Sequence, residues 1–190
     1  MICLIPARGG STRIPKKNIK DFHGRPIISY SILTALDSEL FTKVVVSTDD
    51  TEIARIASLY GAEVIIRSRE LSENKVGTQA VAQDAFNRLQ TSDVYGCVLY
   101  ATCPLLKAED LVKGITTLKD WPSHDYAFSV DTVENENTGN DAGQFYFGRV
   151  SAFREGRPLH LNSVTIPLSH TIDINTPEDF ARAEEMYALL

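Results

Sequence analysis

Residues 2–18 read ICLIPARGGSTRIPKKN, an apolar run that passes directly into a basic loop. The run ICLI at 2–5 predicts a first β-strand. The loop at 5–18 (IPARGGSTRIPKKN) carries four cations, two adjacent glycines and two prolines. Adjacent glycines let backbone amides approach a ligand closely, and successive amides in such a turn form a concave anion site. The loop therefore indicates a site for an anion.

Composition narrows the partners of this site. The chain has 190 residues, is 43% hydrophobic and carries a net charge of −6. That length suits one α/β domain over residues 1–190. A negative net charge argues against binding to nucleic acid or to an acidic membrane surface. A basic cluster in an acidic chain therefore points to a local, small anionic ligand.

Cysteine usage and the N-terminus indicate a cytoplasmic protein. Cys3, Cys97 and Cys103 lie in or beside apolar runs, and no pair has metal-ligand spacing. They are expected to be reduced, buried thiols. We expect no signal peptide, because the first strand begins within two residues, and no membrane span, because no apolar run approaches 18 residues.

Strand-like and helix-like patterns alternate along the chain. Strands are expected at 2–5, 43–47, 62–66, 96–100, 127–130, 144–148 and 163–168. Helices are expected from Pro26 onward, at 51–60 behind the cap Asp50, at 78–90, at 108–119 and from the cap Thr176 onward. Pro167 places the last strand at an edge, since proline cannot donate to a central ladder. The order predicts a mostly parallel sheet with helices on both faces and a ligand at the carboxyl ends of its strands.

Two segments need separate interpretation. Residues 131–143 (DTVENENTGNDAG) are polar, acidic and poor in structure signals, so an exposed loop is expected there. Asp49 ends a strand and can either approach a nucleotide or serve the fold. The basic loop itself is neither a Walker A sequence nor a GxGxxG dinucleotide fingerprint, so composition alone leaves a plain solvated loop open.

The opening loop resembles the signature of the CMP-sialic acid synthetase (acylneuraminate cytidylyltransferase) family, and the likeness continues in order along nearly the whole chain. The other matching segments are GRPIISYSI (24–32), VVVSTDDTEIARIASLYGAEV (44–64), RSRELS (67–72), YATCPLL (100–106), DAGQFYFG (141–148) and IDINTPEDFARAEEMY (172–187). The segments YATCP and DAGQFYFG are most similar to the pseudaminic acid cytidylyltransferase branch.

This resemblance implies a fold, a reaction and partners. The fold would be Rossmann-like, and the protein a nucleotidyltransferase that transfers CMP from CTP to the anomeric hydroxyl of an acidic nine-carbon sugar, a nonulosonic acid, and releases pyrophosphate. Mg²⁺ would be required, and a homodimer is expected for the family. Placement and charge stabilisation would supply most of the catalysis.

The resemblance also implies roles for particular residues. Arg8 and Lys17 would stabilise the phosphate charge, Arg67 would read the cytosine edge, and Asp173 with Asn175 would form the metal pair. The remaining nucleotide-binding residues would be Gly9, Gly10, Ser11, Asn18, Tyr100, Ala101 and Thr102. Gln144 and Tyr146 would line the sugar pocket.

Three departures from the family pattern bear on activity. Thr12 replaces a lysine that usually meets the triphosphate, and Arg13 follows it on what we expect to be another side of the loop. Asn175 replaces the second aspartate of the D-x-D metal pair, so an ion would be held more weakly. The region 131–143 is shorter than the family segment that contributes to the sugar site and the dimer interface.

These departures leave three alternatives open: an active enzyme, a catalytically impaired nucleotide-binding homologue with a regulatory or scaffold role, and the same chemistry on sialic, legionaminic or Kdo-like acids.

The loop's assigned role predicts the behaviour of one variant. Arg8→Ala should abolish measurable CTP binding, because the arginine can grip a phosphate with two donors and alanine offers none. Isothermal titration calorimetry with CTP measures this directly. A folded variant that binds CTP as the parent does would contradict the assignment.

Overall fold

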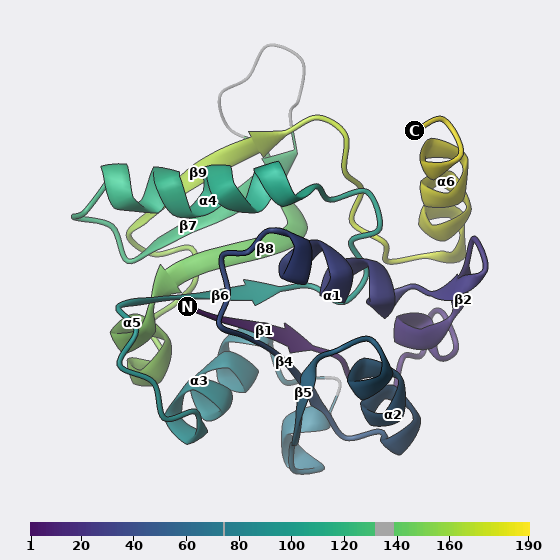
Figure 1. Ribbon diagram of the computed structural model, residues 1–190, viewed down its shortest axis with the longest axis horizontal. Helices are drawn as coiled ribbons and strands as arrows, with labels where there is room; N and C mark the ends of the chain where they lie inside the picture. Colours follow the sequence, from purple (N-terminus) through teal and green to yellow (C-terminus); the bar gives the residue numbers. More distant parts are fainter. Residues whose placement is uncertain (74, 132–138) are drawn as a thin grey trace.

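A central sheet begins at β1 and grows outward to both sides of it (Figure 1). The computed structural model describes residues 1–73, 75–131 and 139–190. The strands of the main sheet, in chain order, are β1 (Ile2–Pro6), β4 (Lys43–Thr48), β5 (Glu63–Ile66), β6 (Tyr95–Leu99), β7 (Tyr126–Asp131), β8 (Asp141–Arg149) and β9 (Ser163–Leu168).

The spatial strand order is β5-β4-β1-β6-β8-β7-β9, and every strand but β8 runs parallel to its fellows. This confirms the mostly parallel sheet. β9 lies at the edge, as its proline requires. The chain builds outward from β1 through β4 to β5 and then returns to the other side of β1 as β6. The loops after β1 and β6 therefore diverge, which opens a switch point at their carboxyl ends.

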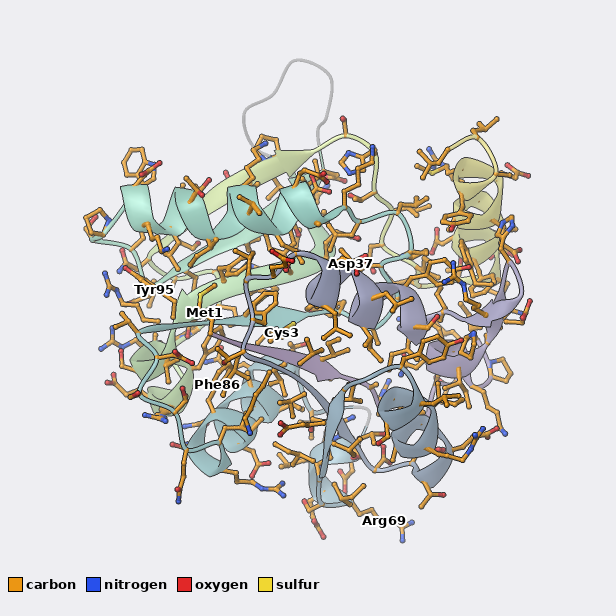
Figure 2. All side chains as sticks on the ribbon, viewed as in Figure 1. Met1, Cys3, Asp37, Arg69, Phe86 and Tyr95 are labelled. Atoms are coloured by element: carbon orange, nitrogen blue, oxygen red, sulfur yellow. The ribbon has the colours of Figure 1, made fainter. Side chains whose placement is uncertain are left out.

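Helices cover both faces of the sheet (Figure 1). They are α1 (Ile28–Asp37), α2 (Thr51–Leu59), α3 (Thr78–Arg88), α4 (Ala108–Asp120), α5 (Val150–Glu155) and α6 (Pro177–Tyr187), with short 3-10 turns η1 (Lys17–Ile19) and η2 (Glu70–Ser72). The side chains of β1 alternate: Cys3 and Ile5 pack with α1, α2 and α4, while Ile2 and Leu4 pack with α3 and α5. Figure 2 places Cys3 within the sheet, Phe86 against it from α3 and Arg69 at the periphery.

The last helix closes a smaller third cluster. Phe180 and Ala183 of α6 pack with Ile14, Phe22 and Ile27 from the segment that follows β1. The expected cap holds, because the Thr176 side chain accepts from the Asp179 N–H at 3.2 Å while Asp179 accepts from the Thr176 N–H at 2.7 Å. Through this packing α6 anchors the segment before it against the basic loop.

Three sequence expectations require correction. Pro26 does not open a helix, because β2 (Asp21–Phe22) and β3 (Arg25–Pro26) form a hairpin whose two turn residues, His23 and Gly24, have φ of 47° and 83°. Helix α5 was not anticipated, because its six residues are too few to show a clear period. Asp131 and residues 141–143 belong to strands, and residues 139–140 lie between strands without regular structure; the expected loop's remaining residues, 132–138, lie outside the described residues.

The expected buried thiols are confirmed, since all three cysteines are free and buried. No helix within the described ranges is long and apolar enough to cross a membrane.

Gly114 of α4 faces two rings of the sheet so closely that a larger residue must disturb them. An added Cβ would lie 2.6 Å from Phe147 and 2.9 Å from Phe145. Gly114→Ala should lower the free energy of unfolding by about 1–3 kcal/mol through overpacking, less the gain of up to about 1 kcal/mol in helix propensity. Urea denaturation measures the change. Gly10→Ala is the control: nothing lies within 4 Å of its added Cβ, so a change within about 0.5 kcal/mol is expected. Equal stability of the Gly114→Ala variant and the parent would contradict this packing.

Candidate functional site

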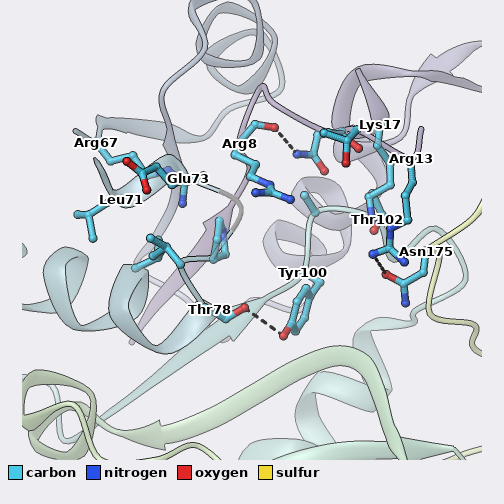
Figure 3. Close-up of a pocket in the computed structure, with 18 residues that line it drawn as sticks. Arg8, Arg13, Lys17, Arg67, Leu71, Glu73, Thr78, Tyr100, Thr102 and Asn175 are labelled. Carbon is cyan, nitrogen blue, oxygen red and sulfur yellow. Dashed lines mark hydrogen bonds between the residues drawn. The ribbon is translucent and has the colours of Figure 1, made fainter. Parts of the chain in front are cut away.

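A cavity of about 360 Å³ lies at the carboxyl ends of β1 and β6, where the strand order reverses (Figure 3). Residues from four segments of the chain, 6–18, 67–81, 100–102 and 175, line it. They are Pro6, Arg8, Ser11, Thr12, Arg13, Lys17, Asn18, Arg67, Leu71, Glu73, Val76, Gly77, Thr78, Val81, Tyr100, Ala101, Thr102 and Asn175.

Most of the residues expected at the site meet in this cavity. Those that line it are Arg8, Ser11, Lys17, Asn18, Arg67, Tyr100, Ala101, Thr102 and Asn175. Gly9, Gly10, Gln144, Tyr146 and Asp173 do not line it. The fold therefore brings together the side chains assigned to a nucleotide, while those assigned to the sugar lie elsewhere.

The basic loop is held in shape from both sides. Asn18 donates from Nδ2 to the Arg8 carbonyl at 2.9 Å, and the Gly9 N–H donates to Asp49 Oδ1 at 3.0 Å. Gly9 has no room for a side chain, since a Cβ would lie 2.6 Å from Asp50 Oδ2. Asp50 caps α2 as expected, accepting from the N–H groups of Glu52 and Ile53. Asp49 thus serves the fold in this structure, and the Gly9 amide is engaged by it.

Four cations and one carboxylate are among the described side chains that line the cavity: Arg8, Arg13, Lys17, Arg67 and Glu73. Arg13 was missed as a site residue. The expectation that it points to another side of the loop than position 12 is wrong, because both Thr12 and Arg13 lie along the cavity. A loop without regular structure has no period from which side-chain directions can be read, so only the folded backbone could show this.

Arg67 presents an unsatisfied donor. Only 6% of the residue is exposed, and its Nε is buried without a hydrogen-bond partner among the described residues. Burial lowers the pKa of the guanidinium, while the nearby Asp49 carboxylate opposes that change. A buried donor is costly unless something accepts from it, so Arg67 is suited to the acceptor atoms of a ligand.

Lys17 reaches across the cavity to the segment before α6. Its Nζ donates to the Ile174 carbonyl at 2.6 Å. Burial lowers the pKa of Lys17, Asp173 opposes the shift, and the like charges of Arg13 and Arg8 add to it. A further negative charge in the cavity would stabilise the protonated amine.

Other side chains secure the same segment. His170 Nε2 lies 2.9 Å from Asp110 Oδ2 of α4, and Gln144 Nε2 donates to the Ile172 carbonyl at 3.2 Å. Asp173, between the contacts at Ile172 and Ile174, packs against Gly143 and accepts from the Asn175 amide. Burial raises the pKa of Asp173, although Asn175 and Lys17 oppose the shift. A bound cation would relieve that unfavourable environment for the carboxylate.

Gln144 and Tyr146 are both 1% exposed, and the Gln144 Nε2 group and the Tyr146 hydroxyl contact other parts of the protein. The Tyr146 hydroxyl donates to Asp141 and lies 3.2 Å from His160 Nε2. Their contact with a sugar stays a prediction; in the structure they support β8 and its neighbours.

The floor of the cavity follows β6. The Tyr100 hydroxyl lies 3.2 Å from Thr78 Oγ1, and burial raises the pKa of Tyr100 to about 12. Cys103, just beyond, is fully buried, and burial raises the pKa of its thiol. A thiol held protonated in this way is unsuited to nucleophilic catalysis, as the sequence indicated.

A family model and several characterised proteins match most of the length of this chain. A family model described as cytidylyltransferase matches residues 2–169. The pseudaminic acid cytidylyltransferase of Campylobacter jejuni (serotype O:2) is 36% identical over 222 residues, covering 98% of this chain and 95% of that protein. The CMP-N,N'-diacetyllegionaminic acid synthase of Legionella pneumophila is 29% identical over 230 residues, covering 100% and 97%.

Solved structures agree on the fold. The structure of CMP:2-keto-3-deoxy-manno-octonic acid synthetase complexed with CTP has a TM-score of 0.80 to this chain, covering 99% of this chain and 98% of that one at 17% identity. The expected Rossmann-like nucleotidyltransferase fold is thereby confirmed.

The environment of Lys17 predicts that affinity for a phosphate ligand should depend on pH. The protonated amine attracts phosphate, so affinity is present below the pKa of Lys17 and is lost as the pH rises through it. Because that pKa is lowered, the loss should begin below the range of an ordinary lysine. Lys17→Arg should remove this alkaline step, since arginine stays charged. Titration of a nucleoside triphosphate between about pH 7 and about pH 10 measures it; the same pH profile in both proteins would rule out Lys17 as a phosphate contact.

Proposed function

The chain belongs to the cytidylyltransferase family, and we propose that it transfers CMP from CTP to the anomeric hydroxyl of a nonulosonic acid, with pseudaminic acid as the favoured acceptor. One observation carries the proposal: Arg67, a buried arginine whose Nε has no partner among the described residues, lines the same cavity as three further cations. A neutral pyrimidine that bears a polyanionic tail matches that distribution of charge.

The base is assigned to Arg67. Cytosine offers a carbonyl oxygen and a ring nitrogen as neighbouring acceptors, and a guanidinium can donate to both. Leu71, Val76 and Val81 line the cavity as well and offer apolar surface to the ring. Arg67 alone does not distinguish the acceptors of cytosine from those of every other base, so the family membership supports this choice of base.

The triphosphate is assigned to Arg8, Lys17 and the loop that carries them. The acceptor hydroxyl oxygen attacks the α-phosphorus in line, its bond to phosphorus forms, and the bond from phosphorus to the bridging oxygen of pyrophosphate breaks. The hydroxyl proton is released to solvent. Negative charge moves onto the departing pyrophosphate, and preplaced cations lower the energy of that state.

Mg²⁺ is the proposed cofactor, and Asp173 is the residue that fits it best. Its carboxylate lies in a poorly solvated place that a cation would improve. Mg²⁺ is commonly held by one or two carboxylates together with substrate phosphates. When bound, the ion would neutralise phosphate charge and orient the reacting groups.

The acceptor site of the proposal comes from the family resemblance. Gln144 and Tyr146 are assigned to it by family resemblance, together with the shortened region 131–143 and a homodimer. The alignment with the Campylobacter jejuni relative spans 222 residues, more than the 190 of this chain, so that relative has positions without a counterpart here.

The decisive experiment measures pyrophosphate release from CTP and Mg²⁺ with pseudaminic, legionaminic, sialic and Kdo-type acids in parallel. Turnover is expected with pseudaminic acid first. Preference for another acid would keep the reaction and change the acceptor. Tight CTP binding without turnover on any acid would favour the impaired homologue, for which Thr12 and Asn175 argue.

Arg67→Ala supplies a matched test of the base assignment. Loss of two charged hydrogen bonds should weaken CTP binding about tenfold or more. The binding of inorganic triphosphate, which has no base, should change little. Equal losses for both ligands would contradict a base-reading role for Arg67.

A further inference from the structure

We propose that Asn175 is a positioning residue for Arg13, whose guanidinium supplies the phosphate-binding charge that Thr12 lacks, and that Asn175 is not a metal ligand. This inference rests on the proposed function, since it concerns the triphosphate end of the same cavity. It explains two departures from the family pattern together: Thr12 lacks a positive charge, and Asn175 holds Arg13 where that charge is needed.

The two residues meet at the cavity wall. Arg13 donates from Nη2 to Asn175 Oδ1 at 3.2 Å, and both residues line the cavity (Figure 3). The other end of the same amide donates to Asp173. The Asn175 side chain thus has its oxygen toward a cation and its NH₂ toward an anion, which is the only orientation in which both contacts are favourable.

The backbone fixes where this amide stands. The Asn175 N–H donates to Asp179 Oδ2 at 2.9 Å, as part of the cap of α6. This bond holds the backbone of residue 175 at the start of α6, and α6 in turn packs on the β2–β3 hairpin. Arg13 is an exposed residue of the irregular loop, and its long side chain reaches the Asn175 amide through a hydrogen bond. The fixed amide holds the far end of the arginine at the cavity.

Because the Asn175 side chain is uncharged, it positions Arg13 without neutralising the positive charge that would bind a phosphate. Arg13 forms no ion pair within the part of the chain that the structure describes. An aspartate at 175 would pair with the guanidinium through a hydrogen bond roughly twice as strong as a neutral one. A phosphate would then have to compete with that carboxylate. Asparagine keeps the geometry and leaves the positive charge to the ligand.

The same contact argues against a metal at Asn175. The oxygen that would coordinate the ion already accepts from a guanidinium, and a divalent cation there would lie against the positive charge of Arg13. Position 175 therefore does not complete a two-carboxylate pair with Asp173. The proposed Mg²⁺ is left with Asp173 and the phosphates as its ligands.

The test is CTP binding by calorimetry with EDTA present, so that no metal contributes. Arg13→Ala should weaken CTP about tenfold or more, as expected for one lost charged contact. Asn175→Asp should also weaken it, by several-fold, although no bulk is added. When Arg13 is already replaced by alanine, Asn175→Asp should reduce CTP affinity clearly less than it does in the parent protein, because its main effect acts through the arginine.

The control introduces the same change of charge far away. For Gln90→Glu, the residue lies near the amino ends of β1 and β4, beside Ile2 and Lys43, whereas the cavity lies at the carboxyl ends of the strands. This variant should leave CTP affinity unchanged. Far-ultraviolet circular dichroism checks that each variant is folded.

Particular results would overturn the inference. Unchanged CTP affinity in Arg13→Ala would remove the arginine from the site. Tighter metal-free CTP binding by Asn175→Asp, or equal losses with and without Arg13, would show that Asn175 does not act through it. If these results came with normal pyrophosphate release by the parent protein, the proposed function would stand and only this inference would fall. A folded parent that bound no CTP would overturn both.

Discussion

The four positive charges that line one cavity of about 360 Å³ repel one another, and nearby carboxylates partly offset that repulsion. Asp49 lies near the buried Arg67 and also fixes the Gly9 amide. Asp173 lies near Lys17, whose own charge is disfavoured by burial. Among the described side chains that line the cavity, the four cations outnumber the single carboxylate, Glu73, so net positive charge remains for a polyanion to neutralise. Ligand binding thereby relieves a cost that the folded protein carries.

The segment from His170 to Asn175 links this cavity to the rest of the molecule. Contacts from α4, β8, the basic loop and α6 reach it through His170, Ile172, Ile174 and Asn175. Each contact engages one point of a short stretch without regular structure. Together they set where Asp173 stands relative to Lys17. Such over-determination is what a site needs when catalysis depends on placement, because small displacements are costly.

Much of the fold could be read from local pattern. Continuous apolar runs such as KVVVS, helical spacing after Asp50 and the Thr176–Pro177 start of α6 all formed as expected. The sequence pattern did not predict the hairpin around His23 and Gly24 or the short helix α5, because two-residue strands and six-residue helices are too short to show a hydrophobic period. The cations of the opening loop were visible in the sequence because they stand out against an acidic chain.

The sequence by itself determined that a basic, glycine-containing loop follows a first strand and that such a loop suits an anionic ligand, since charge and backbone freedom belong to residue type. Only the tertiary structure decided which cations share the cavity, because directions within an irregular loop follow from packing. In the folded chain Arg13 contacts Asn175, 162 positions away in sequence, and the Gly9 N–H donates to Asp49, 40 positions away. Contacts between residues so distant leave no local period or spacing, so they arise only when the sheet assembles and α6 packs onto the hairpin.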